Sequence, residues 1–304
     1  MSRKRQRGRA INGILLLDKP AGLTSNKALQ IVKAIYQAQK AGHTGSLDPL
    51  ATGMLPICFG EATKISNYLL EAKKRYRFTC QLGTVTTTGD AEGEIISSNV
   101  VPALSTDDIE IILQQFRGDI EQVPPMYSAL KHNGERLYDL ARQGIEVERK
   151  PRSVTIYELK LIRLQGDQLE LEAECSKGTY IRTLAQDIGE QLGCGATISA
   201  LHRLVVGPFV KPEAMISLAE LESMQQQDRD ALLLPIDSAL MKWPEVQLNA
   251  DLSFYVAQGQ PVQVPKAPTH GLVRLYNADK QQFLGIGQIK DDGKVAPKRL
   301  FNYT

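Results

Sequence analysis

The chain has 304 residues, of which 42% are hydrophobic and 23% charged, and its formal net charge is +2. This composition is that of an ordinary globular protein, so it excludes disorder over most of the length, and the balanced charge is by itself no argument for nucleic acid as a ligand. At about 100–200 residues per domain, the length predicts two domains.

The cysteines and the N-terminal sequence indicate a reducing compartment. None of the four cysteines forms a Cys-x-x-Cys pair, so neither a disulfide framework nor a zinc site is expected. The N-terminal apolar run, GILLL, is too short for the core of a signal peptide, and no run approaches the roughly 18 apolar residues of a membrane span. We therefore expect a cytoplasmic protein that contacts no membrane.

The N-terminal part of the chain predicts strands and helices around a long loop. A basic tail at residues 1–10 is expected to be disordered, and ILLLDKP is expected to form a buried strand that ends at its proline. Thr24 or Ser25 can cap the helix that follows. The segment 42–53, dense in Gly and Thr, is predicted to be a loop, and a second helix starts near Glu61.

The middle of the chain alternates with a period of two. RYRFTCQL, from Arg75, places Tyr76 on the same face as its apolar residues, as in a half-buried strand. A helix is predicted with Thr106 as its cap, and the polar, basic segment from Pro124 is predicted to be an excursion from the sheet. Apolar residues and glutamates alternate over 169–175 in a further strand, and a helix and the strand ATISALHRLVVGPF follow.

The C-terminal part changes character after Trp243 and Pro244. Short apolar stretches are separated there by Gly, Pro, Asn and Asp, which predicts a small, mostly β domain of about sixty residues. Together the elements predict an α+β fold around a mixed or antiparallel sheet.

Positive charge is clustered although the net charge is small. The clusters lie at Arg3 to Arg9, at residues 73–77 and at residues 142–152. Each is compatible with a phosphate-binding face and equally with solvated surface.

One glycine-rich run stands out, because the signatures of several enzyme classes are missing. There is no P-loop, no G-x-G-x-x-G after a strand and no G-x-S-x-G elbow, and the four histidines are not at metal-ligand spacing. The run is AGHTGSLDPLATGMLPICFGEATK, in which Asp48 precedes a proline. Spacing alone favours a turn-starting Asp, and the alternative is a carboxylate nucleophile held in a cleft.

This run resembles the active-site motif of the pseudouridine synthase superfamily, in the form found in the TruB family. Further segments resemble motifs of that family in the same order: ILLLDKPAGLTSN, KRYRFTCQLGTVTTTGDAEGE, PPMYSALKHNGERLYDLARQG and CSKGTYIRTLAQDIG. The resemblance covers nearly the whole chain. It implies a pseudouridine synthase catalytic domain over 11–245 with a thumb-like, RNA-gripping insertion at about 124–152, followed by a PUA-like RNA-binding domain over 246–304.

The resemblance also implies the reaction. The expected activity is isomerisation of uridine 55 in the T loop of tRNA to pseudouridine, without cofactor or metal, by a monomer that needs no protein partner. Asp48 matches the nucleophile, and Arg182 matches the Arg that pairs with it, for which we expect a bidentate contact. Tyr76 matches the aromatic residue that stacks on the target base, and its hydroxyl is a candidate acid or base.

Further positions are candidate substrate contacts by the same resemblance. Tyr180 and Leu201 match residues of the uracil pocket, and His43 matches a His that fills the space left by flipped bases. Candidate contacts to the RNA backbone or the pocket are Lys19, Lys64 and Arg203. His202 departs from the pattern, which often has Arg there, so no phosphate contact is carried over to it.

Each candidate also has a structural interpretation, such as core packing for Leu201 or solvated charge for the lysines. Two other functions stay open. One is a tRNA-folding chaperone, which the enzyme could also be, and the other is a guide-RNA-dependent, dyskerin-like protein that works within a particle. The joint presence of Asp48, Tyr76 and Arg182 favours an enzyme, and the intact insertion from Pro124 favours a self-sufficient one.

Overall fold

The computed structural model describes residues 8–279 and 281–302. Residues 1–7 of the predicted tail lie outside this range. The expectation of disorder up to residue 10 extends too far, because Arg9 forms an ion pair with Asp230 and its backbone N–H donates to the carbonyl of Gln37.

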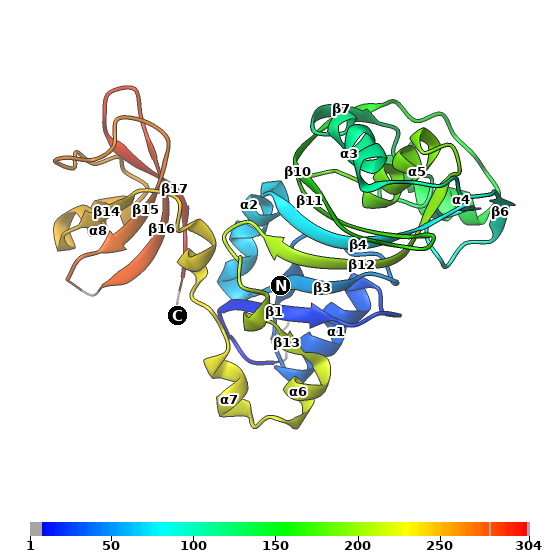
Figure 1. Cartoon of the computed structure of the whole chain (residues 1–304). Coiled ribbons are helices and arrows are strands. Elements are labelled where there is room, and N and C mark those ends of the chain that lie inside the picture. The colour runs from blue at the N-terminus through cyan, green and yellow to red at the C-terminus, as the bar shows by residue number, and fades with distance from the viewer. Residues whose placement is uncertain (1–7, 280, 303–304) are drawn as a thin grey trace.

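A nine-stranded mixed sheet forms the larger part of the molecule (Figure 1). Its strand order is β13-β1-β3-β12-β4-β11-β10-β7, and β2 pairs with β3. The β1–β13 and β12–β3 pairs are parallel and the others antiparallel, which confirms the predicted α+β class with a mixed sheet. The strands are β1 (Gly13–Lys19), β2 (Ala41–His43), β3 (Thr52–Phe59), β4 (Lys74–Leu82), β7 (Gly118–Gln122), β10 (Arg152–Gln165), β11 (Gln168–Cys175), β12 (Ala196–Val206) and β13 (Ile216–Ser217).

Helices α3 and α5 cover one face of β4, β11 and β10 (Figure 1). The alternation over 169–175 produces this layer, because its apolar residues are buried beneath the helices while Glu170, Glu172 and Glu174 point to the opposite face. The helices of the larger part are α1 (Ser25–Ile35), α2 (Ser66–Glu71), α3 (Thr106–Gln115), α4 (Leu137–Arg142), α5 (Ile181–Gln191), α6 (Leu218–Ser223) and α7 (Gln226–Ala231), with 3-10 turns at Gly60–Ile65, Pro212–Ala214 and Ile236–Leu240.

Two helix caps illustrate how local sequence sets the helix ends. Thr24, one of the two candidate caps, caps α1 by accepting from the backbone N–H of Lys27. Helix α3 begins one residue earlier than predicted, because Ser105 is its cap and forms a reciprocal capping box with Asp108.

Strand β3 is not among the predicted strands, and it contains Pro56, which is unusual in a central strand. The structure tolerates Pro56 because its carbonyl accepts from Thr44 on the β2 side. A residue's N–H and C=O point to the same edge of a strand, so the missing N–H faces the gap between the β2 and β12 pairings. The predicted loop at 42–53 is accordingly shorter, running between His43 and Thr52.

A separate four-stranded sheet, with order β14-β15-β16-β17, stands at one end of the larger sheet (Figure 1). Its Phe283, Ile286 and Phe301 belong to the same apolar cluster as Ile14 and Ile65, so the two parts share a packed contact. Helix α8 was not anticipated in this mostly β part. The elements are β14 (Glu245–Leu248), α8 (Ala250–Ala257), β15 (Leu272–Asn277), β16 (Gln282–Ile289) and β17 (Val295–Leu300).

Two short hairpins project from the larger sheet. They are β5 (Thr84–Thr86) with β6 (Ile95–Ser98), and β8 (Lys131–His132) with β9 (Glu135–Arg136). The second hairpin and α4 make up the excursion predicted from Pro124. Within the described part of the chain, no helix is long and apolar enough to span a membrane.

Candidate active site

The loop between β2 and β3 presents Asp48 on a rigid backbone. The buried Ser25 hydroxyl accepts from the Leu47 N–H at 2.7 Å and donates to the Leu47 carbonyl at 3.0 Å. On the other side, the Pro49 carbonyl accepts from the Gly22 N–H at 2.8 Å and from Lys19 Nζ at 3.3 Å. The residues on both sides of Asp48 are therefore fixed, while 40% of its own side-chain surface stays open to a ligand.

Arg182, in the first turn of α5, holds the Asp48 carboxylate. Its Nε lies 2.9 Å from Asp48 Oδ2, and its side chain is only 6% exposed. Its terminal nitrogens donate elsewhere, Nη1 to the Thr88 carbonyl at 2.8 Å and Nη2 to the Tyr127 carbonyl at 2.7 Å. The pairing was predicted, but the bidentate geometry was not found, because the terminal nitrogens are committed to the two carbonyls.

Asp90 is a second acid at this site, and sequence reasoning missed it. It is almost fully buried, with Oδ2 3.5 Å from Arg182 Nη1, and it accepts from Thr88 Oγ1 and the Glu92 N–H at 2.5 and 3.1 Å. Arg182 thus lies between two carboxylates. The available signal was a second Asp in a turn rich in Gly and Thr, which spacing alone does not distinguish from an ordinary turn.

The environment of Asp48 makes it harder to ionise than a surface Asp. Burial raises the pKa of the Asp48 carboxyl above its ordinary value; the Arg182 guanidinium opposes this shift, and the negative charge of Asp90 adds to it. An acid whose pKa is perturbed by burial and by a specific charged partner, at an accessible position, is typical of a functional site.

Tyr76 and Arg203 lie side by side next to this loop, on paired positions of β4 and β12. Burial raises the pKa of the Tyr76 phenol, while the Arg203 charge and a hydrogen bond from it act in the opposite direction. Arg203 is 1% exposed and donates to the carbonyls of Met54 and Gly45 at 2.7 and 3.1 Å. Arg203 therefore links Tyr76 to the Asp48 loop within the protein interior and is not a surface cation.

Lys19 has a similar internal position. Its ammonium donates to the carbonyls of Pro20, Leu23 and Pro49, and it is fully buried. Burial lowers its pKa to about 8, although the nearby Asp48 charge acts in the opposite direction. Lys19 thus holds the loop through backbone carbonyls, and the three carbonyls account for all three N–H donors of its ammonium group.

The apolar wall of the site includes two further predicted residues. Leu201 is buried in the same cluster as Leu47, with Tyr76 packed against it. Tyr180 directly precedes α5, and burial raises the pKa of its phenol, with Asp48 close enough to add to the shift. Tyr76 and Tyr180 are thus near enough to Asp48 to feel its charge, and Leu201 belongs to the apolar cluster that also contains Leu47.

His43, Lys64 and His202 lie in different surroundings. His43 lies in β2, where burial and the Arg203 charge lower its pKa, and within the described residues its buried Nδ1 has no hydrogen-bond partner. Lys64 is not brought to the site: it lies against Glu61 and donates to the Leu300 carbonyl at 3.0 Å, at the contact with the C-terminal sheet. His202 bonds the Thr52 hydroxyl at 2.8 Å.

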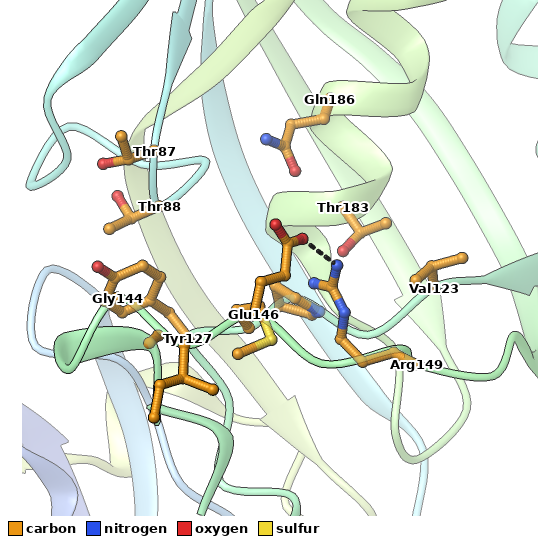
Figure 2. Close-up of a pocket in the computed structure, with 13 residues that line it drawn as sticks. Thr87, Thr88, Val123, Tyr127, Gly144, Glu146, Arg149, Thr183 and Gln186 are labelled. Atoms are coloured by element: carbon orange, nitrogen blue, oxygen red, sulfur yellow. Dashed lines mark hydrogen bonds and ion pairs between the residues drawn. The ribbon is translucent and has the colours of Figure 1, made fainter. Parts of the chain in front are cut away.

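A cavity of about 380 Å³ is lined by Thr88 and Tyr127, the two residues whose carbonyls accept from Arg182 (Figure 2). Thr87, Thr88, Thr183 and Gln186 line it from the body of the protein. The opposite wall comes from the insertion and from its root, by which we mean residues 122–127. The residues of this wall are Val123, Pro125, Met126, Tyr127, Ala141, Gly144, Ile145, Glu146 and Arg149. Figure 2 shows Glu146 and Arg149, both on the wall that the insertion supplies, pointing toward one another, and their closest atoms are 2.9 Å apart.

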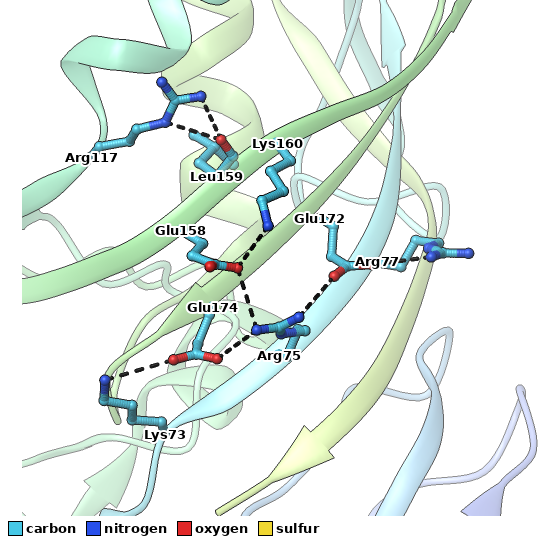
Figure 3. A network of polar contacts seen from close by, with 9 residues as sticks. All are labelled: Lys73, Arg75, Arg77, Arg117, Glu158, Leu159, Lys160, Glu172 and Glu174. Carbon is cyan, nitrogen blue, oxygen red and sulfur yellow. Dashed lines mark hydrogen bonds and ion pairs between the residues drawn. The ribbon is translucent and has the colours of Figure 1, made fainter. Parts of the chain in front are cut away.

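The basic cluster at residues 73–77 is neutralised on the outer face of the sheet (Figure 3). Arg75 lies within 2.9–3.4 Å of Glu158, Glu172 and Glu174, and Arg77 lies 3.0 Å from Glu172. Lys74 is buried and donates to backbone carbonyls. This cluster therefore forms a ladder of ion pairs between β4, β11 and β10, which favours its interpretation as a paired surface over a phosphate-binding face.

No group of three or more His, Cys, Asp or Glu side chains within residues 8–279 and 281–302 is placed to hold a metal ion. All four cysteines are buried free thiols.

Comparisons with known proteins point to one family. Family models match three consecutive parts of the chain: the N-terminal domain of TruB family pseudouridylate synthase over residues 33–181, the tRNA pseudouridylate synthase B C-terminal domain over 182–241, and the C-terminal model of pseudouridine synthase II TruB over 244–301. The tRNA pseudouridine synthase B of Nitrosococcus oceani is 58% identical over 300 residues, covering 98% of this chain and 97% of that protein.

Two further matches agree. The tRNA pseudouridine synthase B of Yersinia pestis is 55% identical over 310 residues, covering 99% of this chain and 95% of that protein. A solved structure described as "Crystal Structure of a Cbf5-Nop10-Gar1 Complex" matches with a TM-score of 0.72 at 26% identity, over 95% of this chain and 84% of that chain.

The fold, together with these matches, defines a pseudouridine synthase, an enzyme of the isomerase class. The predicted α+β class with a separate C-terminal β sheet is confirmed. The chain belongs to the TruB family of pseudouridylate synthases.

Proposed function

We propose that this protein isomerises uridine 55 in the T loop of tRNA to pseudouridine, with Asp48 as the nucleophile. The observation that carries the proposal is the contact between the buried Arg182 and the partly open Asp48, at 2.9 Å. The relatives from Nitrosococcus oceani and Yersinia pestis are tRNA pseudouridine synthases, which supports tRNA as the substrate. We also propose that the protein acts in the cytoplasm as a monomer and without a protein partner.

The site provides a role for each group in the reaction. The target uridine must leave the folded loop before a pocket can act on it, and the neutral ring of His43 can occupy the space that the flipped bases leave. Asp48 attacks the base or the sugar and forms a covalent bond, the glycosidic C–N bond breaks, and the base turns until C5 bonds to the sugar carbon. The bond to Asp48 breaks again before the product leaves, so the carboxylate is released unchanged. The proton on C5 then leaves, and in this proposal the Tyr76 hydroxyl takes part in the transfer. The net reaction is redox-neutral.

The test is incubation of the purified chain with an unmodified tRNA transcript, followed by chemical mapping of pseudouridine. We expect modification at position 55 without any guide RNA. A transcript with cytidine at position 55 is the matched control and should remain unmodified. Modification only at another position, or only after a guide RNA is added, would contradict the proposal and favour the guide-dependent alternative.

A second role, as a tRNA-folding chaperone, is compatible with the charges of the insertion. Lys131, Lys150 and Arg152 line a cavity of about 380 Å³ there, together with His132. Within residues 8–279 and 281–302 none of the three forms an ion pair, in contrast to the neutralised cluster at residues 73–77. Free cations on a polar insertion can contact RNA phosphates whether or not the reaction takes place.

Replacing Lys150 and Arg152 together by Gln is expected to weaken tRNA binding by about tenfold, because two unpaired cations are removed. The slope of log affinity against log salt should fall by about 1 for each lost phosphate contact. Binding is measured by filter retention at several salt concentrations. The matched control is Lys160→Gln with Arg163→Gln, since these cations already pair with Glu158 and Glu170. An equal loss in both double variants would reject the assignment.

Asp90→Asn should change both the rate and its pH dependence. The maximal rate should fall, because Arg182 loses one of its two acidic partners. The acid limb of the pH–rate profile should move to lower pH, since the Asp90 charge raises the pKa of Asp48 and its removal lets Asp48 ionise more easily. The measurement is the single-turnover rate as a function of pH.

The matched control for this profile is Asp187→Asn. Burial raises the pKa of Asp187 to about 6, so this acid on α5 also titrates in the acid range. Asp187 makes no contact with Arg182 or Asp48 among the ion pairs of the described residues, and its replacement should leave the acid limb unchanged. An acid limb that moves with Asp187→Asn but not with Asp90→Asn would contradict the assignment of this limb to Asp48.

A further inference from the structure

Gln122, the last residue of β7, binds the backbone of one residue far away in the sequence. Its side chain is buried, and the residue is only 2% exposed. Its amide nitrogen donates to the Tyr180 carbonyl at 3.3 Å, and its amide oxygen accepts from the Tyr180 N–H at 3.0 Å. A buried amide thus directs both of its ends to the same residue, which fixes that backbone in position and orientation.

Tyr180 is the point from which α5 starts. Its carbonyl also accepts from the Leu184 N–H at 3.0 Å, and its own side chain forms no capping hydrogen bond. Arg182 follows two residues later, in the first turn of the helix. The position of the Tyr180 backbone therefore sets both the Tyr180 ring, which lies near Asp48, and the guanidinium that holds Asp48.

The root of the insertion contacts this helix a second time. Arg182 Nη2 donates to the Tyr127 carbonyl at 2.7 Å, five residues after Gln122. Val123, Met126 and Tyr127 line the cavity of about 380 Å³, so side-chain packing is incomplete on that side of the root (Figure 2). Where packing is incomplete, these directed hydrogen bonds are left to set the spacing between the root and α5.

We infer that Gln122 is a positioning residue of the reaction, which acts through Tyr180 and Arg182 to align the nucleophile Asp48. The inference rests on the proposed function. Gln122 touches no reacting atom itself. Its effect is on geometry, and a displacement of about 1 Å in a catalytic group can reduce a rate by about a hundredfold.

The test compares Gln122→Leu, which cannot form either hydrogen bond, with Gln122→Glu, which keeps the acceptor for the Tyr180 N–H. We expect kcat to fall about 10–100-fold for Leu and less for Glu, with the Kd for tRNA within about twofold of wild type. Gln81→Leu is the matched control, because among the described residues the Gln81 side chain makes one hydrogen bond, to the Leu82 carbonyl at 3.3 Å, on the same sheet. Thermal melting establishes that each variant is folded at the assay temperature.

A double-mutant cycle with Arg182→Lys separates positioning from mere stability. If Gln122 acts through Arg182, the loss in kcat for the double variant should be smaller than the product of the two single losses. A folded Gln122→Leu with wild-type kcat, or losses that multiply independently, would overturn the inference. Failure of the proposed function itself would appear differently, as absence of pseudouridine 55 with the wild-type chain.

Discussion

Asp48→Ala and Asp48→Asn are expected to abolish isomerisation, with turnover at least about ten-thousandfold below wild type, while tRNA binding largely survives. Asn keeps the shape of the side chain but lacks the charged oxygen that attacks. Binding should persist because the loop backbone is held by Ser25 and Lys19 through the neighbouring residues, and these contacts do not involve the Asp48 side chain.

The thermal stability of Asp48→Asn shows whether its loss of activity results from unfolding. Since burial raises the pKa of Asp48, the folded state binds its proton more tightly than the unfolded state does. The pKa of Asp48 is lower in the unfolded state than in the folded state. As the pH rises from the first value through the second, ionisation of the carboxyl therefore lowers the free energy of unfolding progressively. Above both values the full loss of stability is present. The Asn variant carries no such cost, so its melting temperature at neutral pH should equal or exceed that of wild type.

The measurements are single-turnover conversion of unmodified tRNA, equilibrium binding, and tRNA refolding with the same variants. Turnover close to wild type with either replacement would refute the assignment of Asp48 as nucleophile. If Asp48→Ala still accelerates tRNA folding, the chaperone role is independent of catalysis. If acceleration is lost together with turnover while binding persists, the separate chaperone role is rejected.

Arg182→Lys is expected to have the second-largest effect, with kcat reduced at least about a hundredfold. The guanidinium reaches Asp48, Thr88 and Tyr127 at once, within 2.7–2.9 Å, and an ammonium has neither the planar fork nor the reach to replace all three contacts. The carbonyls left without a donor should lower the free energy of unfolding by about 1–3 kcal/mol.

Conversion rate and chemical unfolding of Arg182→Lys test these two effects. The matched control is Arg77→Lys, because Arg77 forms a half-exposed pair with Glu172 at 3.0 Å on the outer face of the sheet. Such a surface pair contributes little, so this variant should stay within about 0.5 kcal/mol of wild type and keep its rate. An Arg182→Lys enzyme as active as Arg77→Lys would show that the pairing with Asp48 is not needed.

The sequence by itself determined the features that depend on local periodicity and on short motifs. The alternation over 169–175 predicts the buried face of β11, and Thr24 predicts the start of α1, because these patterns follow from the period of a strand and from the unpaired N–H groups of a helix end. The glycine-rich run around Asp48 and the ordered motifs on the same chain identify the family.

Only the tertiary structure decided how the charges are used. Arg203 and Lys19 are internal supports, Lys64 lies at the C-terminal sheet, and Arg75 is neutralised by glutamates about a hundred residues away in sequence. Asp90 joins Arg182 across a similar separation. Whether a charge is buried, paired or free depends on the partners that the fold brings to it, and a strand or helix pattern contains no information about partners so distant. The alignment of Asp48 by Arg182, and the anchoring of Tyr180 by Gln122, are of this second kind.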